Sequence, residues 1–312
     1  MNQSMLVVIG LPTCKRPQGL ARLLDSIAKQ RVDFEVQVLV ADNDCEQQEG
    51  IKTVVRYQQQ GFRFPLEAFV VPERGISQVR NALLQRAFVD CQADLLAMLD
   101  DDEWAEEEWL SSLVLVQRLT QADVVGGYVI PEFAVPAPDW VQGLPVYPVS
   151  KPQQSGYVRL IYGTTNVLLS KSILTRFPGQ LFDPFYSLVG RGDVEFFTRL
   201  KKHGATFAFA HRARSHELFG ASRLTKQWAR ERAFRDGAGD MRIMWLNNPS
   251  IKRVVIESGI IVVAGVVAGV QLLLRIKSHR RMAAQLLFMR QVGKIFGLFG
   301  KHKQVYRQIH GH

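Results

Sequence analysis

The stretch LLAMLDDDEW, Leu95–Trp104, constrains the fold of this chain more than any other. Its apolar run, Leu95–Leu99, ends abruptly at three aspartates, Asp100–Asp102, as a buried parallel strand does at the carboxyl edge of its sheet. Ligands of open α/β sheets bind at that edge. Because three adjacent carboxylates repel one another, they favour either full solvent or a hard cation such as Mg²⁺ or Mn²⁺. Spacing alone leaves two interpretations: a metal and phosphate site, or a solvated acidic turn that caps the next helix.

The segments before this stretch alternate between strand and helix patterns. Apolar runs over Leu6–Leu11, Phe34–Val40 and Glu67–Val71 predict strands, and helical spacing of apolar residues follows the first and the third of them. This alternation over roughly the first 120 residues predicts a right-handed, doubly wound βαβ sheet. The second strand ends in another acidic cluster, Asp42–Asp44, so two such strand ends can face one crevice.

Other segments carry residue types that suit a phosphate site or acid–base chemistry. Arg80 and Asn81 lie in the first turns of the helix predicted after the third strand. A cation beside free backbone N–H groups suits a diphosphate, although Arg80 could equally pair with a nearby carboxylate. Asp193 opens the helical pattern DVEFFTRLKKHG, where an N-cap is the simplest role for an aspartate. The proline-rich segment Pro131–Pro152 is either a lid or a loop that packs its Trp140 into the core.

Positive charge is concentrated toward the C-terminus. The net charge is +10, yet the residues from Arg199 onward include 22 Lys or Arg and 5 Asp or Glu, against 17 and 24 before them. This part begins with a predicted strand, Phe207–Ala210, a polar segment, His211–Glu217, and a basic helix, Leu224–Arg235. No acidic residue follows Glu257. The pattern suits an anionic membrane or nucleic acid, and the many Val, Leu and Phe residues of the tail favour lipid, so we expect no nucleic-acid partner.

The last segments predict helices at a membrane surface. The apolar run Gly259–Leu274 is about 16 residues long, short of the ~20 that an upright span needs. Met282–Phe299 mixes apolar and basic residues, as an interfacial helix does. A helical hairpin packed on the preceding domain or on a second subunit is the alternative.

We therefore expect two parts, a main domain over residues 1–248 and a helical, basic and apolar region over residues 249–312. The three cysteines include no CxxC pair, which suggests neither disulfides nor a zinc site and fits a reducing compartment. The expected location is cytoplasmic, peripheral on the cytoplasmic face of the inner membrane. The composition does not predict the oligomeric state.

The order of these pieces resembles the inverting family 2 glycosyltransferases with the GT-A fold, particularly the bacterial branch that builds exopolysaccharide and lipopolysaccharide. The similarity runs from Leu6 to about Gly237, and the matching stretches are PTCKRP, ADND, ERGISQVRNALLQRA, LLAMLDDDEW, VVGGYVIP, YGTTNVLLS, GRGDVEFFTRL, RARSHE and RLTKQWARER. Their shared order carries the resemblance, and it disfavours the acidic-turn interpretation. It implies an α/β fold, GT-A: a doubly wound mixed sheet of the nucleotide-diphospho-sugar transferase kind, with a C-terminal helical, membrane-associating appendage.

The resemblance also implies a nucleotide pocket. Pro12 and Thr13 would line it, and Asp42 would accept a hydrogen bond from the base, typically uracil. Arg80 and Asn81 would stand near the diphosphate.

The implied catalytic groups are carboxylates at two places. Asp100 and Asp102 match the ends of a DxD motif, with Asp102 the direct ligand of a divalent cation, Mg²⁺ or Mn²⁺, and Asp100 toward the ribose or donor sugar. His216 or Glu217 falls where some members have a further group near the diphosphate or the metal, so the expected metal residues are Asp102, Asp100 and His216. Asp193 matches the catalytic base.

One departure from the family pattern lies beside this base. The branch usually shows Gly-Gly-Glu-Asp, whereas this chain has Gly190-Arg191-Gly192-Asp193. The base is kept, its acidic neighbour is lost, and an arginine is gained. The change would retune the acceptor pocket.

The activity implied is transfer of a sugar, with inversion and metal assistance, from a nucleotide-diphosphate sugar such as a UDP-sugar to a saccharide or lipid-linked acceptor. Two alternatives remain. A nucleotidyltransferase would also need a metal site at a sheet edge, but PTCKRP lacks the glycines of a phosphate loop. A non-catalytic sugar-nucleotide-binding subunit of a membrane synthase is disfavoured because Asp100, Asp102 and Asp193 are all present.

Overall fold

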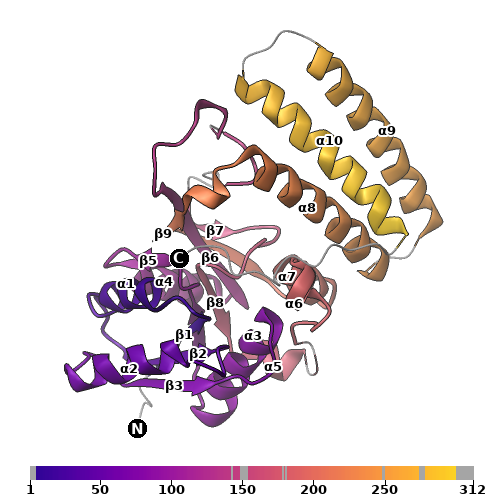
Figure 1. Cartoon of the computed structure of the whole chain (residues 1–312). Helices are drawn as coiled ribbons and strands as arrows, with labels where there is room; N and C mark the ends of the chain where they lie inside the picture. Colours follow the sequence, from indigo (N-terminus) through magenta and orange to yellow (C-terminus); the bar gives the residue numbers. More distant parts are fainter. Residues whose placement is uncertain are drawn as a thin grey trace.

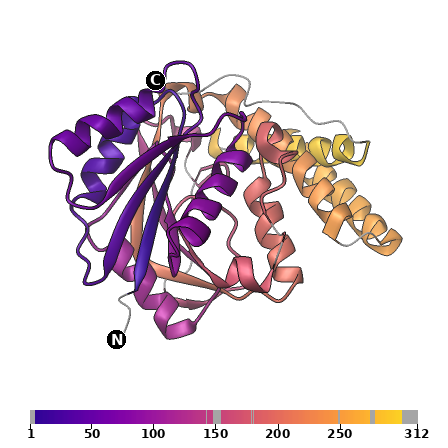
Figure 2. The same cartoon turned by 90° about the horizontal axis from the view of Figure 1, so that it is seen from below.

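A mixed β-sheet forms the centre of the molecule, with helices on both of its faces (Figures 1 and 2). The computed structural model describes residues 5–141, 143–147, 154–177, 179, 181–247, 250–273 and 278–299. Within these residues the strand order is β3-β2-β1-β4-β8-β6-β9-β5, and β7 pairs with β9. The strands are β1 (Leu6–Thr13), β2 (Glu35–Asp42), β3 (Leu66–Val70), β4 (Leu95–Met98), β5 (Glu103–Ala105), β6 (Val124–Phe133), β7 (Gly156–Tyr157), β8 (Val167–Ser170) and β9 (Phe207–Phe219).

The helices of the main domain cover the sheet, and three long helices follow it along the chain. The helices that cover the sheet are α1 (Pro17–Ile27), α2 (Glu49–Gln59), α3 (Ile76–Gln85), α4 (Trp109–Thr120), α5 (Ser172–Arg176), α6 (Tyr186–Val189) and α7 (Gly192–Lys202), with a π-turn (Arg86–Asp90) and a 3₁₀ turn (Asp139–Val141). After β9 come a 3₁₀ turn (Ala221–Arg223), α8 (Lys226–Asn247), α9 (Ile251–Leu273) and α10 (Ser278–Leu298).

The first half of the sheet is parallel and brings polar residues to one edge. β1 pairs in parallel with both β2 and β4, and Thr13 lies opposite Asp42 while Gly10 lies opposite Met98. The carboxyl ends of three strands are therefore level, and Asp100 follows directly after one of them. β8 then runs antiparallel to β4 and to β6. The predicted doubly wound α/β sheet with a C-terminal helical appendage is confirmed.

Two apolar clusters, one on each face of the sheet, explain why the strands have continuous apolar runs in the sequence. Val7 and Ile9 of β1 pack with the helix α1 on one face, and Val8 packs with Leu83 of α3 on the other. All of these side chains are fully buried. At about 1.5 to 3 kcal/mol for each large aliphatic side chain, this burial fixes the register of the strands.

Several predicted boundaries are wrong. β9 does not end at Ala210 but continues to Phe219, so the polar segment His211–Glu217 lies inside a strand. That segment pairs with β6 in parallel and with β5 on its other edge. The cause is tertiary: two neighbouring strands satisfy its backbone although its side chains are polar. The basic helix predicted to end at Arg235 likewise continues to Asn247 as α8.

The interpretation of Asp100–Asp102 as the cap of the next helix is also wrong, because no helix begins directly after these residues. The next element is β5, and α4 starts at Trp109 with Glu108 as its N-cap. In the proline-rich segment, β6 extends to Phe133, and Trp140 and Tyr147 are buried against Phe219 and its neighbours. The described part of this loop therefore packs into a core; residues 142 and 148–152 lie outside the described residues.

The C-terminal helices lie side by side at one end of the molecule (Figures 1 and 2). α8 and α10 touch backbone to backbone: a Cβ added to Gly237 would lie 2.0 Å from the carbonyl oxygen of Arg290, and one added to Gly293 would lie 2.0 Å from that of Phe234. Glycine at both positions permits this approach, as small residues do where helices pack closely. α10 is thus mainly a packing helix, which favours the hairpin alternative for this segment.

α9 differs from the prediction in length. It begins at Ile251, before the apolar run that was counted from Gly259, and extends to Leu273. Among the described helices, α9 is the one with a stretch, Ile251–Gln271, that is long and apolar enough to cross a membrane by length and composition. Only 11% of that stretch is buried.

Candidate active site

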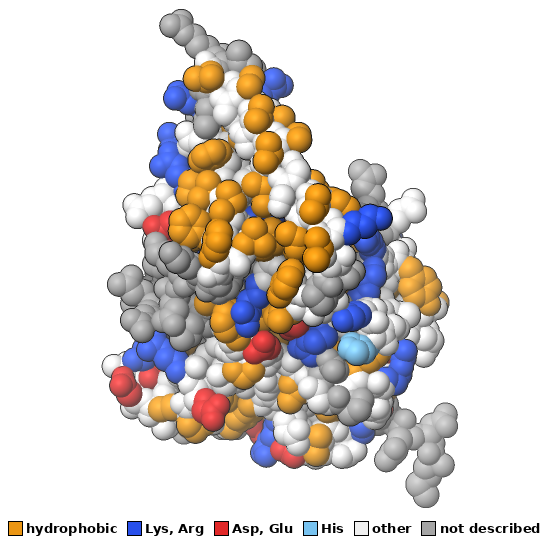
Figure 3. Space-filling view, turned by 90° about the vertical axis from the view of Figure 1, so that its right-hand side faces the viewer, with side chains coloured by type: hydrophobic (Ala, Val, Ile, Leu, Met, Phe, Trp, Pro, Cys, Tyr) orange, Lys and Arg blue, Asp and Glu red, His pale blue; other side chains and the backbone are white. Residues whose placement is uncertain are grey.

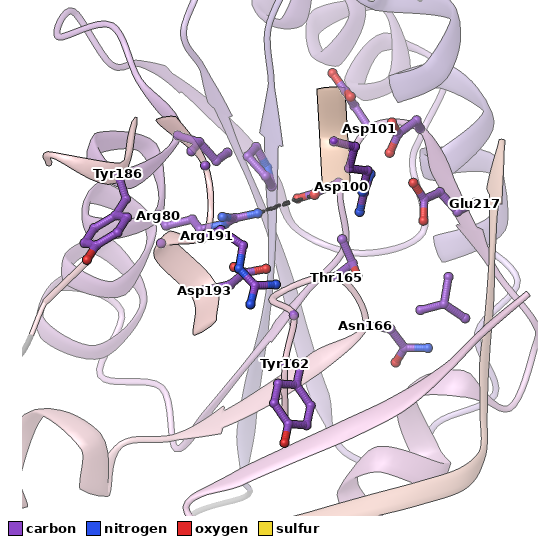
Figure 4. A pocket seen from close by; sticks show the side chains of 18 of the residues that line it. Arg80, Asp100, Asp101, Tyr162, Thr165, Asn166, Tyr186, Arg191, Asp193 and Glu217 are labelled. Carbon is purple, nitrogen blue, oxygen red and sulfur yellow. Dashed lines mark hydrogen bonds and ion pairs between the residues drawn. The ribbon is translucent and has the colours of Figure 1, made fainter. Parts of the chain in front are cut away.

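A single large pocket opens at the carboxyl edge of the parallel strands, between the sheet and α8. Its volume is about 1030 Å³, which is at the upper end of the range for sites that enclose a small-molecule ligand. Residues from both halves of the chain meet there (Figure 4). Of the residues predicted for the site, the pocket is lined by Pro12, Thr13, Arg80, Asp100, Asp102, Asp193 and Glu217.

The three aspartates after β4 are held by arginines and a threonine from distant segments. Arg80 donates to Asp100 at 3.3 Å, and Thr13 Oγ1 donates to Asp101 at 2.9 Å. Arg16 bridges Asp101 and Asp102 with N–O distances of 2.9 and 3.2 Å. The aspartates are therefore ordered by ion pairs and are not a solvated turn.

A fourth carboxylate, Glu217 of β9, faces the same cluster. Arg223 donates to Asp102 at 2.8 Å and to Glu217 at 3.3 Å, and so ties β9 to the aspartates. Burial raises the pKa of Glu217 to about 7, and the nearby Asp102 adds to this effect while Arg223 opposes it. Burial likewise raises the pKa of Asp101 to about 6 and the pKa of Asp100. The arginines thus do not fully compensate the negative charge that gathers here.

A buried hydrogen-bond chain fixes the backbone beneath the aspartates. The Asp100 N–H donates to Glu103 Oε2 at 2.9 Å, and the Ser215 hydroxyl donates to Glu103 Oε1 at 3.1 Å. Asn166 donates to Ser215 at 3.0 Å and accepts from the Trp109 indole at 2.8 Å. Glu103 is fully buried, and burial raises its pKa well above the usual range. These hydrogen bonds join the segments that contain Glu103, Trp109, Asn166 and Ser215 beneath the three aspartates.

Asp193 also lines the pocket, in the first turn of α7, and lies beside Arg191 (Figure 4). The N-cap of this helix is Arg191, so the interpretation of Asp193 as an N-cap is wrong. Its Oδ1 accepts from the N–H of the next residue, Val194, at 2.8 Å. Gly163 lies beside the carboxylate, since a Cβ there would be in ordinary van der Waals contact with Asp193 Oδ2, at 3.8 Å. A carboxylate that faces a pocket in this way suits a general base.

Three predicted residues are not brought to the pocket. Asp42 is fully buried and accepts from the Gly50 N–H at 2.8 Å, and its neighbour Asn43 lines the pocket instead. Asn81 exchanges hydrogen bonds with the backbone of Phe182. Both side chains therefore act on the protein scaffold.

His216, the third of these residues, points away from the aspartates. It stacks on Trp104 with ring centroids 5.2 Å apart, and its nitrogens face Glu106 and Glu132. Successive side chains of a strand point to opposite faces, so Glu217, and not His216, reaches the pocket. The expectation of His216 as a metal residue is not supported by this geometry.

The donor set fits a divalent cation only together with oxygens from a substrate. Asp100, Asp102 and Glu217 offer hard carboxylate oxygens and an excess of negative charge. Within the described residues, however, no group of three or more His, Cys, Asp or Glu side chains is arranged to hold an ion by itself. Mg²⁺ is commonly bound by one or two carboxylates plus substrate phosphates, and this site suits that mode once Arg16 and Arg223 give way at Asp102.

Comparison with known proteins places this chain in a family. The model of glycosyl transferase family 2 matches residues 8–177. Succinoglycan biosynthesis protein ExoM of Rhizobium meliloti (strain 1021) is 31% identical over 245 residues, which are 78% of this chain and 76% of that protein. The chain belongs to glycosyltransferase family 2. It is therefore an enzyme, a glycosyltransferase, and the nucleotidyltransferase alternative is excluded.

Solved structures share the fold of this glycosyltransferase at low sequence identity. S. aureus TarS 1-349 in complex with UDP has a TM-score of 0.52 and 13% identity, covering 95% of this chain and 92% of that chain. GalNAc-T7 with UDP, GalNAc and Mn²⁺ has a TM-score of 0.57 and 12% identity, covering 78% of this chain and 50% of that chain. The predicted GT-A fold is confirmed.

Sequence reasoning missed the residues that bind the aspartates. Arg16 is the fifth letter of PTCKRP, a stretch that was noted only for its first two residues. Arg223 pairs with a carboxylate 121 positions earlier in the chain. Glu103 follows the aspartates directly in the sequence, and this adjacency was the signal that could have identified it. The structure places it at the start of β5.

Proposed function

We propose that this glycosyltransferase transfers a sugar from a UDP-sugar to a hydroxyl of a saccharide acceptor, with inversion at the anomeric carbon, in the synthesis of a bacterial polysaccharide. The observation that carries the proposal is that two carboxylate sites from distant segments line one pocket: Asp193 at the start of α7, and Asp100–Asp102 after β4. Single displacement needs a base on the acceptor side and positive charge on the leaving-group side. Family 2 membership and the similarity to ExoM support the reaction and the pathway.

Asp193 is the proposed base. It accepts the proton of the acceptor hydroxyl while that oxygen attacks the anomeric carbon, and the bond to the nucleoside diphosphate breaks on the far side. Arg80, Arg16 and Arg223 line the pocket beside the aspartates that they contact, and they are proposed to bind the diphosphate oxygens by charge-assisted hydrogen bonds. Preorganised groups of this kind commonly contribute a factor of about 10² to 10³ each to turnover.

A divalent cation is proposed beside the same diphosphate. Asp102, Asp100 and Glu217 would hold it with the donor's phosphate oxygens, and when bound it would neutralise the charge that develops on the leaving group. A solved structure of the same fold includes Mn²⁺ with UDP. For the nucleotide, Pro12 and Thr13 line the pocket, and TarS is known in complexes with UDP and with UDP-GlcNAc, which supports a UDP-sugar.

Attachment to the cytoplasmic face of a membrane is a further part of the proposal. Figure 3 shows hydrophobic side chains gathered over the end of the molecule where α9 lies, with lysines and arginines around them. The exposed fractions reach 82% at Ile251, 64% at Val263 and 87% at Leu273. Large contiguous apolar surface of this kind marks an interaction site, and the absence of acidic residues after Glu257 favours anionic lipid over a protein partner. A lipid-linked saccharide would then reach the pocket from the membrane side.

The test is a screen of purified full-length protein against a panel of nucleotide sugars, with Mg²⁺, Mn²⁺ or a chelator. Release of UDP from one UDP-sugar, enhanced by a divalent cation and by an added saccharide acceptor, is the expected result, with a product of inverted anomeric configuration by NMR. A retained configuration would refute single displacement. Transfer that is equally fast in the chelator would refute the metal role.

Flotation with anionic liposomes tests the membrane part separately. Full-length protein is expected to float at low salt and to float less when Val262, Val263 and Val266 of α9 are replaced together by serine. Protein that stays at the bottom of the gradient at low salt would show that α9 packs against protein instead.

A further inference from the structure

Asp240 of α8 joins two arginines from parts of the chain that flank it in space. Its Oδ1 accepts from Arg191, the residue that precedes α7. Its Oδ2 accepts from Arg290 of α10, with an Nε distance of 3.1 Å. The Asp240 side chain is 19% exposed and that of Arg191 is 21% exposed, so this half of the bridge is largely shielded from water and its charge-assisted hydrogen bond is strengthened. The Arg290 side chain is 43% exposed, so the half of the bridge that reaches α10 lies closer to solvent.

Arg191, at one end of this bridge, belongs to the turn Gly190–Gly192 that leads to Asp193, the proposed base in the first turn of α7. We call this turn together with Asp193 the Asp193 loop. Arg191 stands two residues before Asp193 and lines the same pocket. Burial lowers the pKa of its guanidinium, but the carboxylates of Asp240, Asp236 and Asp193 outweigh this effect and raise it, which means that all three lie close to it. Figure 4 shows Arg191 and Asp193 next to each other.

The backbone of this loop has little stiffness of its own. Arg191 has φ of +71° and Gly190 has φ of +81°, and Gly192 follows. Glycines on both sides permit many conformations, and a left-handed arginine costs on the order of 1 kcal/mol. Something outside the loop must therefore select the conformation that aims Asp193 into the pocket.

α8 provides the surface that selects it. A Cβ on Gly239 would lie 2.8 Å from Arg191 Cγ, so the arginine stem lies directly on the helix at a position where only glycine leaves room. α8 is in turn fixed by α10 through the backbone contacts of Gly237 and Gly293. The loop, α8 and α10 thus form one packed unit.

We propose that Asp240 is a positioning residue for the Asp193 loop, and that α10 secures it through Arg290. The C-terminal helices are then part of the catalytic apparatus as well as a membrane attachment. This inference rests on the proposed role of Asp193 as the base. It also gives the arginine that departs from the family pattern a function, because Arg191 exchanges a carboxylate beside the base for a tether to α8.

The test compares two substitutions on the same helix. Arg290→Gln breaks the bridge to Asp240, whereas Lys294→Gln breaks only the ion pair with Glu257 of α9, which is 2.9 Å long and does not reach the loop. Each full-length variant is assayed in detergent for kcat, for the donor KM, for affinity to UDP and for melting temperature. Arg290→Lys and Asp240→Asn complete the set.

If Asp240 positions the base loop, Arg290→Gln lowers kcat by about ten- to a hundredfold, as misplacement of a reacting group by about 1 Å does. Its donor KM and UDP affinity stay within about twofold of wild type, since the residues proposed to bind the donor are untouched. Lys294→Gln keeps kcat within about twofold despite a similar change in melting temperature. Arg290→Lys recovers most of the lost turnover, and Asp240→Asn, if it folds, resembles Arg290→Gln.

Equal kcat values for Arg290→Gln and Lys294→Gln would overturn the inference, as would an Arg290→Lys variant no better than Arg290→Gln. Asp193→Asn serves as the reference for the proposed function. If Asp193→Asn loses turnover while Arg290→Gln does not, only the positioning role fails. If Asp193→Asn retains turnover, the proposed base fails and the positioning role fails with it.

Discussion

Replacing Glu217 by glutamine is expected to stabilise the protein at alkaline pH. The Glu217 side chain is 14% exposed and faces Asp102 across Arg223. Burial, together with the charge of Asp102, raises its pKa from 4.5 to about 7. A carboxyl group with a raised pKa takes up a proton on folding, so its contribution to stability is full below pH 4.5 and is lost as the pH rises through about 7. Glutamine mimics the protonated form at every pH.

The size of the effect follows from the pKa change. At about 1.4 kcal/mol for each pKa unit, a rise from 4.5 to about 7 corresponds to about 3 kcal/mol. The Glu217→Gln variant should therefore match wild type near pH 5 to within about 1 kcal/mol and exceed its free energy of unfolding by about 3 kcal/mol at pH 8. Such a stabilising change beside an active site indicates that the carboxylate is kept for function.

Urea unfolding of both proteins between pH 5 and pH 8 measures this difference directly. The other carboxylates with raised pKa values, Asp100, Asp101 and Glu103, are present in both proteins. The charge of Glu217 raises the pKa of Glu103, so its removal relieves that repulsion and acts in the same direction. A Glu217→Gln variant that is less stable than wild type at pH 8, or a difference that does not change with pH, would refute the argument. The pocket would then not contain uncompensated negative charge.

Three other outcomes follow from the structure. Glu103→Ala should lower the free energy of unfolding by about 2 to 5 kcal/mol, because it leaves the Asp100 N–H and the Ser215 hydroxyl without their acceptor. Glu103→Gln should lower the free energy of unfolding less, and equal losses for the two variants in urea titrations would contradict this. Gly293→Ala should lower the free energy of unfolding by about 1 to 3 kcal/mol, because its Cβ would meet the backbone of α8. Gly265→Ala on α9, with open space around it, should not lower it, and equal melting temperatures for the two variants would contradict this. Asp102→Asn should abolish divalent-dependent transfer with the fold intact by circular dichroism, and activity that survives this change would remove Asp102 from the metal site.

The sequence predicted the parts of the fold whose patterns are local. β1, β2 and β4 are buried on both faces, so their apolar runs are legible without knowledge of their neighbours. β9 could not be delimited in this way, because its second half carries charged side chains and owes its conformation to β6 and β5. The helices α8 and α10 were separated by the predicted boundary at residue 248, although they pack on each other; that boundary stays a prediction.

The candidate site shows the same division. The strand end before Asp100–Asp102 is visible in the sequence, but the role of Asp193 was predicted only through the family resemblance, since the helical pattern alone favoured a cap. Which of two adjacent residues reaches the pocket was not predicted. Glu217 lines the pocket and its neighbour His216 does not, and Asn43 lines it while its neighbour Asp42 does not. A change of one position reverses the face of a strand, and only the three-dimensional register settles it.

The role of Asp193 is the central claim, and one measurement tests it most directly: turnover of the Asp193→Asn variant alongside its affinity for the nucleotide sugar. In the proposed mechanism Asp193 acts on the acceptor, whereas Arg80, Asp100 and Asp102, which line the same pocket, act on the donor. The variant should therefore bind the UDP-sugar within about twofold of wild type and lose turnover by at least about 10². Turnover near that of wild type, with donor binding unchanged, would contradict the account and leave the base unassigned.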